Sequence, residues 1–343
     1  MPNALITGGL GFIGSNLSAR LLGEDWSVTV LDNFSRRGAE DNARWLAEQA
    51  APGQLTVTCG DVRDAALVAR ALADADVVFH LAGQVSAVAS IRDPRADFEV
   101  NALGTFNVLE AARQRQPGPV VIFTSTNKVY GSLDDMAAIQ LPKRWAYANG
   151  RRGIAETQPL DFYSPYGCSR GAAEQYVRDY ARIYGLRTVV FRMSAIYGPH
   201  QFATDDQGWV AFFCIQSVFK RPVGLYGVGK QVRDVLYVDD LIRAFLTACS
   251  RAGEVSGEIF NIGGGCENTL SIQELFDLLK ARHGRRVQWS TVGHRAGDQK
   301  IYVSDIAKAQ RQLDWSLTVS VPEGVNRLCA WIEANRELFE DKA

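Results

Sequence analysis

A glycine-rich loop near the N-terminus constrains this chain more than any other feature. Gly8, Gly11 and Gly14 follow the short apolar run 4–7 and precede a stretch with helical periodicity. Glycines let the backbone turn tightly and approach a ligand closely, and the N-terminus of a helix offers free N–H groups and a partial positive charge. The strand–loop–helix order therefore predicts a pyrophosphate site, whereas the same spacing in a plain turn would bind nothing.

A carboxylate follows at the end of the second expected strand. Asp32 stands 18 residues after Gly14 (32 − 14), at the distance where an acidic side chain accepts the ribose hydroxyls of a dinucleotide. Its charge repels a 2′-phosphate, although Arg36 and Arg37 nearby favour one. We take the carboxylate as the stronger influence and expect NAD rather than NADP.

The first half of the chain alternates short β-branched runs with longer amphipathic ones. That alternation predicts an α/β fold with a Rossmann doubly wound parallel sheet. After Arg192 the pattern breaks up, which indicates a smaller mixed α/β domain with helices near 210–219 and 272–280. We expect a discontinuous NAD-binding domain (1–192 plus 235–262) and a second, substrate-binding domain (193–234 plus 263–343). The expected strands are 4–7, 27–31, 55–59, 77–81, 120–124 and 188–192, with helices that include 65–73 and 96–115.

Composition excludes several classes of function. The formal charge of −1 gives no overall field that favours nucleic acid or an anionic membrane. Six cysteines without a C-x-x-C pair argue against a metal site or a redox dithiol. The N-terminus has no signal-peptide pattern and no apolar segment reaches 18 residues, so we expect a cytoplasmic protein.

Polar and small side chains follow the other expected strands, at the edge where open α/β sheets bind ligands. The segments are 60–62, 80–84 and 124–131. His80 is a candidate base, but a histidine at the end of an apolar strand is more often a packed core residue, and we favour that interpretation. The hydroxyls of Thr124, Ser125 and Thr126 suit either a ligand or simple turn chemistry.

A later helix carries a tyrosine and a cation on one face. Tyr166 and Arg170 stand four residues apart, the spacing of neighbours on a helix. A tyrosine with an ordinary pKa of ~10 needs a fixed cation nearby to act as a base at neutral pH. In isolation, such a pair is often just a packed ring beside a solvated arginine.

Together these motifs resemble the extended short-chain dehydrogenases/reductases that act on nucleotide sugars. The resemblance covers essentially the whole chain. Longer strings narrow it to the branch that epimerises CDP-paratose at C2, namely 32–38, 126–130, 164–169, 201–204, 206–210 and 229–234. Three positions depart from the pattern: Arg170 replaces the usual lysine, and Pro199-His200 replaces a glycine and an arginine.

The resemblance implies roles for individual residues. Tyr166 would be the base, Arg170 the cation that assists it, and Thr126 a hydrogen-bonding partner of the reacting oxygen. The enzyme would act on a CDP-hexose, keep its NAD bound, and form a homo-oligomer, either a dimer or a tetramer. The implied cofactor residues are Gly8, Gly11, Phe12, Ile13, Gly14, Asp32, Asn33, Ser35, Arg36, Asp61, Val62, Leu81, Ala82, Gln84, Asn101, Thr124, Tyr166 and Arg170. The implied substrate residues are Asn127, Ser194, Gln207, Trp209, Val210, Tyr226, Arg233 and Arg295.

Other functions stay open at this point. A nucleotide-sugar C4-epimerase uses the same base and cation. A 4,6-dehydratase usually needs an acid/base pair after the catalytic hydroxyl, and Asn127-Lys128 has no acidic member. A non-catalytic protein that binds NAD on this fold is the alternative of another class, because Arg170 departs from the usual lysine.

Overall fold

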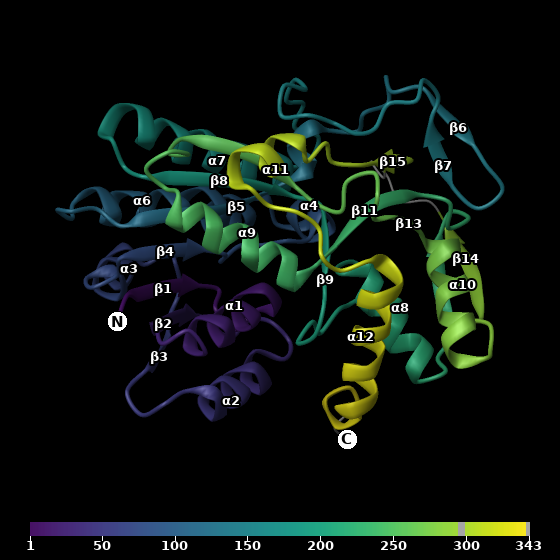
Figure 1. Ribbon diagram of the computed structural model, residues 1–343, viewed down its shortest axis with the longest axis horizontal. Helices are drawn as coiled ribbons and strands as arrows, with labels where there is room; N and C mark the ends of the chain where they lie inside the picture. The colour runs from purple at the N-terminus through teal and green to yellow at the C-terminus, as the bar shows by residue number, and fades with distance from the viewer. Residues whose placement is uncertain (294–298, 341–343) are drawn as a thin grey trace.

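The computed structural model describes residues 1–293 and 299–340. Its largest sheet has seven strands in the order β12-β8-β5-β4-β1-β2-β3 (Figure 1). Every neighbouring pair is parallel, and the chain winds outward from β1 in both directions, so the expected Rossmann sheet is confirmed. The strands are β1 (Asn3–Thr7), β2 (Ser27–Asp32), β3 (Leu55–Cys59), β4 (Val77–His80), β5 (Val120–Thr126), β8 (Thr188–Met193) and β12 (Glu258–Ile262).

Two strand ends differ from the sequence expectation. β4 ends at His80 instead of Leu81, and β5 continues to Thr126 instead of ending at Thr124. The extension follows from the pairing of β5 with β8, whose register runs on to Thr126 opposite Met193. The hydroxyl residues that suited a turn are therefore the last residues of a buried strand.

Helices cover both faces of this sheet. One apolar cluster joins the sheet to α1, α2 and α9, and a second joins its other face to α3, α6 and α7. The helix bounds are α1 (Phe12–Leu22), α2 (Ala39–Gln49), α3 (Ala65–Leu72), α6 (Gly104–Arg113), α7 (Pro165–Tyr184) and α9 (Val238–Ser250).

The single helix expected over 96–115 is interrupted by a π-helical turn. The short helices α4 (Ala87–Arg92) and α5 (Pro94–Phe98) come first, and the π-helix η1 (Glu99–Leu103) then leads into α6. The hydroxyl of Thr105 donates a hydrogen bond to the carbonyl of Asn101, at 2.6 Å. A π-turn holds one more residue than an α-turn, and hydrophobic periodicity does not reveal such an insertion.

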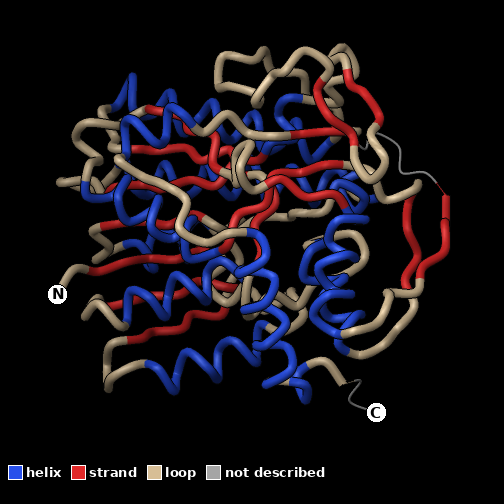
Figure 2. The backbone as a smooth tube through the Cα atoms, turned by 45° about the vertical axis from the view of Figure 1, so that its right-hand side comes forward, coloured by secondary structure: helices blue, strands red, loops and turns tan. Residues whose placement is uncertain are grey.

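Past β8 the chain builds a second group of elements beside the sheet (Figure 2). Its central strand, β11, pairs with β9, β13 and β15, and the parallel pair β10 and β14 lies at the outer edge. The expected helices near 210–219 and 272–280 are confirmed as α8 and α10. The bounds are β6 (Ala138–Gln140), β7 (Trp145–Tyr147), β9 (Ala195–Tyr197), α8 (Trp209–Val218), β10 (Val223–Tyr226), β11 (Val232–Tyr237), β13 (Thr269–Ser271), α10 (Ile272–His283), β14 (Trp289–Gly293), β15 (Ile301–Tyr302), α11 (Ala307–Leu313) and α12 (Val321–Ala334).

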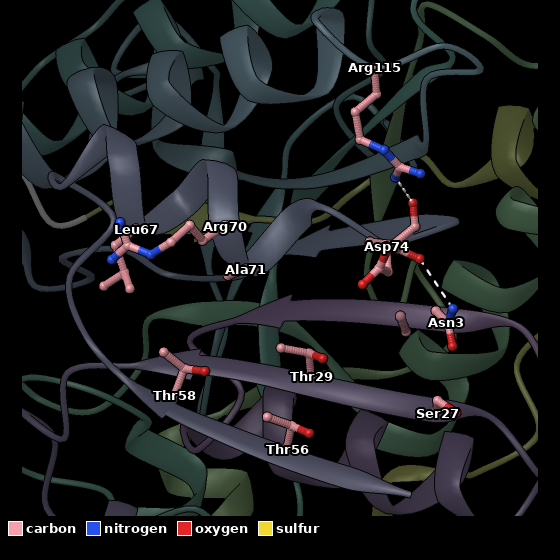
Figure 3. A pocket seen from close by; sticks show the side chains of 12 residues that line it. Asn3, Ser27, Thr29, Thr56, Thr58, Leu67, Arg70, Ala71, Asp74 and Arg115 are labelled. Atoms are coloured by element: carbon pink, nitrogen blue, oxygen red, sulfur yellow. Dashed lines mark hydrogen bonds between the residues drawn. The ribbon is translucent and has the colours of Figure 1, made fainter.

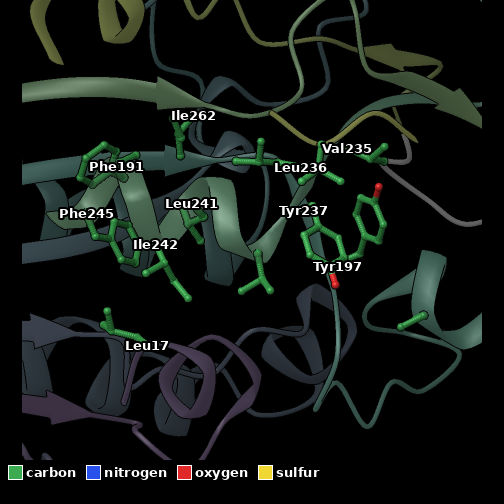
Figure 4. Close-up of a cluster of buried hydrophobic side chains, with 14 of the residues drawn as sticks. Leu17, Phe191, Tyr197, Val235, Leu236, Tyr237, Leu241, Ile242, Phe245 and Ile262 are labelled. Atoms are coloured by element: carbon green, nitrogen blue, oxygen red, sulfur yellow. The ribbon is translucent and has the colours of Figure 1, made fainter. Parts of the chain in front are cut away.

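One apolar cluster connects the two groups of elements. The ring of Phe245 on α9 lies 5.2 Å from that of Phe191 on β8, and Tyr197 packs edge to face against Tyr237 at 5.6 Å (Figure 4). The same cluster extends to α8 and α12, so the second group is anchored to the sheet. The boundaries of the two expected domains stay a prediction. In the described ranges, no helix has the length and apolar character needed to cross a membrane.

Candidate active site

The glycine loop is packed too tightly for larger residues. Gly8 has a φ of +70°, and a Cβ there would lie 2.8 Å from the backbone of Ala82. A Cβ on Gly14 would lie 2.3 Å from the carbonyl oxygen of Gly8. Gly11 is the residue before the first turn of α1. The loop thus brings the start of α1 to the carboxyl end of β1, where a phosphate would meet its N–H groups.

A cavity of about 490 Å³ opens at the carboxyl ends of the sheet strands. Its volume lies in the range of small-molecule sites. Segments far apart in the sequence meet in its wall, as the motif pattern predicts. The wall contains most of the expected cofactor residues, namely Gly8, Gly11, Phe12, Ile13, Gly14, Asp32, Asn33, Ser35, Arg36, Asp61, Val62, Leu81, Ala82, Gln84, Thr124, Tyr166 and Arg170.

Asp32 is fixed by the backbone on both sides. Its Oδ2 accepts a hydrogen bond from the N–H of Leu10 at 3.0 Å, and its Oδ1 accepts one from the N–H of Phe34 at 2.9 Å. Burial raises the pKa of Asp32, and these two bonds oppose the rise. Each carboxylate oxygen keeps a second acceptor position, so the side chain can still receive ribose hydroxyls from the cavity.

Asp61 is a second carboxylate in the wall. Its oxygens accept hydrogen bonds from the guanidinium of Arg63 and from the side-chain amide of Asn33, at 2.9 and 3.0 Å. These contacts lower the pKa of Asp61 to about 2. The group is therefore ionised at neutral pH and orients Asn33 at the cavity.

Helix α7 places the tyrosine and the arginine together. Ser164 caps the helix by accepting a hydrogen bond from the N–H of Gly167 at 3.2 Å. One turn separates Tyr166, which is 9% exposed, from Arg170, which is 2% exposed. Both side chains line the cavity, which is the arrangement that the helical spacing predicts.

Arg170 is buried without a full set of partners. Its Nη2 donates to the backbone carbonyl and the hydroxyl of Thr124, and the guanidinium carbon lies 5.0 Å from the centre of the Phe123 ring. Its Nε and Nη1 have no hydrogen-bond partner among the described residues. Burial lowers the pKa of Arg170, while Tyr166 and Asp97 act in the opposite direction. Unused donors on a buried cation mark a place where a ligand oxygen fits.

Thr126 and Asn127 lie next to this group but outside the cavity wall. Thr124 and Thr126 share a face of β5 because strand residues alternate. The hydroxyl of Thr126 accepts a hydrogen bond from the N–H of Lys128 at 3.2 Å, and both Thr126 and Asn127 are mostly buried. Their predicted roles toward the substrate stay predictions.

Asn101 supports the wall from behind. Its Oδ1 accepts a hydrogen bond from the N–H of Gln84 at 3.0 Å, and its Nδ2 donates to Asp97 and to Ser169, each at 3.1 Å. We expected Asn101 and Gln84 from the motifs, but not Asp97 or Ser169. The available signal was the four-residue spacing of Asp97 from Asn101 and the position of Ser169 beside Arg170.

The expected substrate residues are not gathered at the cavity. Gln207 lines it, whereas Val210 packs in the main apolar cluster and the hydroxyl of Ser194 donates to the carbonyl of Asp234 at 2.9 Å. Arg233 donates to two backbone carbonyls at 2.8 Å. The remaining three are Trp209 at the start of α8, Tyr226 at the end of β10, and Arg295, which lies outside the described residues.

The cavity wall also contains residues to which the sequence reasoning gave no role, among them Ser86, Asp206 and His200. Ser86 donates a hydrogen bond to Asp206 at 2.7 Å, which joins the loop after β4 to the loop before α8. His200 stacks on Trp45 with ring centres 3.6 Å apart. The departure from the family pattern at Pro199-His200 was a signal for the contact between His200 and Trp45, since an aromatic side chain there reaches helix α2.

His80 is a packed residue and not a free base. Its ring nitrogens pair with the hydroxyls of Thr7 and Thr105, at 2.7 and 2.9 Å. Burial lowers the pKa of His80 to about 3. The ring is therefore neutral near pH 7, and the interpretation that we favoured fits its surroundings.

A second cavity, of about 710 Å³, lies between α3 and the strands β1, β2 and β3 (Figure 3). It is near the amino ends of β1 and β2, where Asn3 and Ser27 lie, and two of its polar side chains bond to nearby backbone carbonyls. The side chain of Asn3 donates to the carbonyl of Asp74 at 3.2 Å, and Arg115 donates to the carbonyl of Ala75. Ligands of open α/β sheets bind at the opposite end, so this cavity is a weaker candidate.

The first cavity suits a dinucleotide. The glycine loop leaves space that a Cβ would fill, Asp32 can accept ribose hydroxyls, and Arg170 has donors without partners. Among the described residues, no group of three or more histidine, cysteine, aspartate or glutamate side chains is placed to hold a metal ion.

Comparisons with known proteins agree with this geometry. Residues 4–263 match the model of the NAD dependent epimerase/dehydratase family. The chain is 44% identical over 334 residues to CDP-paratose 2-epimerase of Salmonella typhi, covering 95% of this chain and 98% of that protein.

Solved structures share the whole fold. DesIV, a dTDP-glucose 4,6-dehydratase of Streptomyces venezuelae solved with NAD bound, superposes with a TM-score of 0.84 at 31% identity, covering 98% of this chain and 99% of that one. A UDP-glucose 4-epimerase of Thermotoga maritima, solved with UDP-glucose, gives 0.82 at 30% identity, covering 97% and 99%. The chain therefore belongs to the NAD dependent epimerase/dehydratase family, in the extended short-chain dehydrogenase/reductase group of nucleotide-sugar enzymes.

Proposed function

We propose that this enzyme inverts C2 of a CDP-hexose, converting CDP-paratose to CDP-tyvelose with NAD that stays bound. The observation that carries the proposal is the 44% identity to a CDP-paratose 2-epimerase along nearly the full length of both chains. The cavity that holds Tyr166 and Arg170 beside the glycine loop supports it.

The chemistry at C2 explains why a cofactor is needed. C2 has no neighbouring carbonyl to acidify its C–H bond, so direct deprotonation is difficult. Bound NAD supplies a hydride acceptor that can later return the hydride. Tyr166, as the phenolate, would take the proton of the 2-hydroxyl as C2 is oxidised to a 2-keto sugar. It would return that proton when the keto group is reduced from its other face, which gives the epimer.

The neighbouring side chains prepare Tyr166 for this role. Arg170 places a permanent positive charge one turn away, inside a buried site where screening by water is weak. Thr126 would hold the reacting oxygen with its hydroxyl, at the end of β5. Gln207 in the cavity wall, with Arg233 and Arg295 for the diphosphate, would bind the CDP-sugar.

Two other reactions of the family remain as alternatives. A C4-epimerase would use the same Tyr166 and Arg170 on a different carbon. A 4,6-dehydratase is disfavoured because Asn127 and Lys128 give no carboxylate after Thr126, and the Nζ of Lys128 donates to the side chain of Gln299 at 3.4 Å. A non-catalytic NAD-binding protein would hold the cofactor without any turnover.

Proton NMR of the purified protein with CDP-paratose, without added reductant, tests the proposal. We expect a new sugar whose coupling between H1 and H2 shows inversion at C2, and no turnover by Tyr166→Phe. Turnover of a UDP-hexose at C4 instead would replace the proposal by the first alternative. An unchanged spectrum from protein that contains NAD would favour the binding protein.

Solvent labelling tests the hydride route separately. In heavy water the C2–H bond of the product should stay unlabelled, because a hydride passes to the cofactor and back without meeting solvent. Deuterium at C2 would show proton abstraction and would remove Tyr166 and NAD from their proposed roles in hydride transfer.

We also propose that the protein is a homo-oligomer. Large apolar side chains are exposed on neighbouring helices, among them Phe98 at 56% and Ile183 at 66%. Phe106 on α6 and Tyr176 on α7 pack edge to face at 5.9 Å and are both partly open to solvent. A patch of this kind marks an interaction site. Light scattering should give a dimer or tetramer for the parent and a monomer for Phe106→Glu.

The cytoplasm is the location that we propose for this enzyme. Its six cysteines show no paired spacing, as is usual where thiols stay reduced. Fractionation of cells that express the tagged chain should recover it with cytoplasmic markers.

A further inference from the structure

A fully buried carboxylate lies behind Arg170. Asp97 on α5 is 0% exposed. Its Oδ1 accepts hydrogen bonds from the side-chain amides of Gln84 and Asn101, at 2.9 and 3.1 Å, and its Oδ2 accepts one from the hydroxyl of Ser169 at 2.5 Å. Burial raises the pKa of Asp97, while the hydrogen bonds from these three donors and the charge of Arg170 oppose the rise and favour the ionised carboxylate.

These contacts connect Asp97 to Arg170 by two short routes. Ser169 precedes Arg170 on α7, so its bond to Asp97 fixes the turn that carries the guanidinium. The Oδ1 of Asn101 and the Nη1 of Arg170 lie 3.0 and 2.8 Å from the same point, the position that a Cβ on Gly83 would occupy. Asp97 thus holds the segments on both sides of the arginine.

Of the two carboxylates that act on Arg170, Asp97 is the one left to balance its charge. Tyr166 and Glu174 face Arg170 from α7, His80 from β4, and Asp97 from α5. Glu174 already pairs with Arg192 at 2.5 Å, and His80 is neutral. Among the described residues, Asp97 makes no ion pair within 4 Å. Its charge is therefore available to offset that of Arg170, in a buried site where water screens both charges only weakly.

We propose that Asp97 is a positioning residue that balances the buried charge of Arg170, and that this balance lets the cavity hold the oxidised, cationic form of NAD. The nicotinamide ring is positive in NAD+ and neutral in NADH. A cavity with an unbalanced arginine would therefore favour NADH. The inference concerns the protein and its cofactor, and it holds whichever sugar is the substrate.

A double-mutant cycle in thermal unfolding tests the pairing of charges. Asp97→Asn leaves Arg170 uncompensated, and Arg170→Met leaves Asp97 uncompensated, so each should lower the melting temperature. The double variant has neither buried charge and should melt about 1–4 °C above the additive value. Additive effects would overturn the proposal, and so would a double variant that fails to fold while Arg170→Met folds.

The ratio of bound cofactor forms tests the consequence. The protein is equilibrated with a known mixture of NAD+ and NADH, and the cofactor that it retains is released and measured. The preference for NADH over NAD+ should be about tenfold greater in Asp97→Asn than in the parent. Arg170→Met should shift the ratio the other way, which keeps the test available if Asp97→Asn does not fold.

Ser169→Ala is the matched control, because it removes a hydrogen bond to Asp97 and keeps both charges. Its cofactor ratio should stay within about twofold of the parent even if its melting temperature falls. If the cofactor ratio changes as much in Ser169→Ala as in Asp97→Asn, Asp97 acts through structure alone. The same conclusion follows if the ratio changes in neither variant.

Discussion

Helix α7 contributes to two buried arginine sites that differ in one respect. Arg192 donates to the carboxylate of Glu174 at 2.5 Å and to the hydroxyl of Tyr130 at 2.8 Å, and Ser125 donates to the same carboxylate at 2.6 Å. Arg170, four residues before Glu174, keeps two nitrogens without partners among the described residues. The first arginine completes a network within the protein, and the second has donors left for a ligand.

The difference separates a structural role from a functional one. A buried cation with all its donors used stabilises a fold only as part of its network, since the loss of one member leaves another charge uncompensated. A buried cation with unused donors is costly to the fold and is explained by what it binds. The following predictions test this division.

Arg170→Met should have the largest effect on catalysis. The charge beside Tyr166 is lost, and turnover should fall about 1,000-fold or more because general acid–base catalysis contributes that order. The measurement is the rate of product formation by NMR. Circular dichroism should show a folded protein. Turnover equal to that of the parent would mean that the cation has no part in the chemistry.

Arg192→Met should have the largest effect on stability. Glu174 would remain buried without its cation, at a cost of about 3–5 kcal/mol. Thermal unfolding should show a melting temperature lower by about 4–7 °C, well beyond the decrease for Arg170→Met. If Arg170→Met costs as much stability as Arg192→Met, the two sites do not differ as we infer.

Asp32→Ala should separate the two nicotinamide cofactors. The carboxylate lines the cavity and keeps an acceptor position for ribose hydroxyls. Its loss should weaken NAD about 30-fold and NADP much less, because hydrogen bonds to a charged group contribute about 2 kcal/mol. Isothermal titration of both cofactors measures this. Equal losses would remove Asp32 from the ribose site.

Two histidines make the stability of the protein depend on pH. Burial lowers the pKa of His80 to about 3 and that of His200 to about 4, below the unfolded value near 6.5. Between these values the unfolded chain binds more protons, so the free energy of unfolding decreases as the pH falls from 6.5 toward 4.

His200→Asn removes part of that decrease. The φ of His200 is +60°, a conformation that asparagine tolerates. Between pH 7 and pH 4.5 the variant should lose about 1–2 kcal/mol less stability than the parent, allowing for the partial exposure of the ring. Urea unfolding at both pH values measures this. An unchanged difference would show that His200 titrates normally in the folded protein.

The sequence revealed what depends on local pattern. The strand–loop–helix order around Gly8 and the carboxylate at Asp32 predicted the sheet and the cofactor edge, because parallel strands bring their carboxyl ends together. Tyr166 and Arg170 followed from helical spacing. These features need no knowledge of the rest of the fold.

Features that depend on tertiary contacts could not be predicted from the sequence. The π-turn at Asn101 changes which side chains face inward, and the pairing of β5 with β8 carries Thr126 past the expected strand end. Asp97 meets Ser169 across 72 residues of sequence, so no local spacing could relate them. The contact of Ser86 with Asp206 likewise requires two loops to meet.

Arg170→Lys should have the smallest effect on turnover. It tests whether the site needs a guanidinium or only a positive charge. An ammonium keeps the charge near Tyr166 but is compact, so it cannot reach Thr124 and a ligand with separate nitrogens as a guanidinium does. A planar guanidinium occupies the space beside Gly83, where an added Cβ would lie 2.8 Å from Nη1. Turnover by Arg170→Lys should equal that of the parent or exceed it by a few-fold, because small displacements near the reacting atoms alter rates strongly.

Gly83→Ala then distinguishes shape from charge at this position. In the parent, the new methyl group should displace the guanidinium and lower turnover about tenfold. In the Arg170→Lys background, the shorter reach of the ammonium should leave room, and the loss should be smaller, limited by the contact with Asn101 at 3.0 Å. Equal losses in both backgrounds would show that Gly83 serves the cofactor or Asn101 and not the arginine. The arginine would then differ from a lysine at this site by its hydrogen bonds alone.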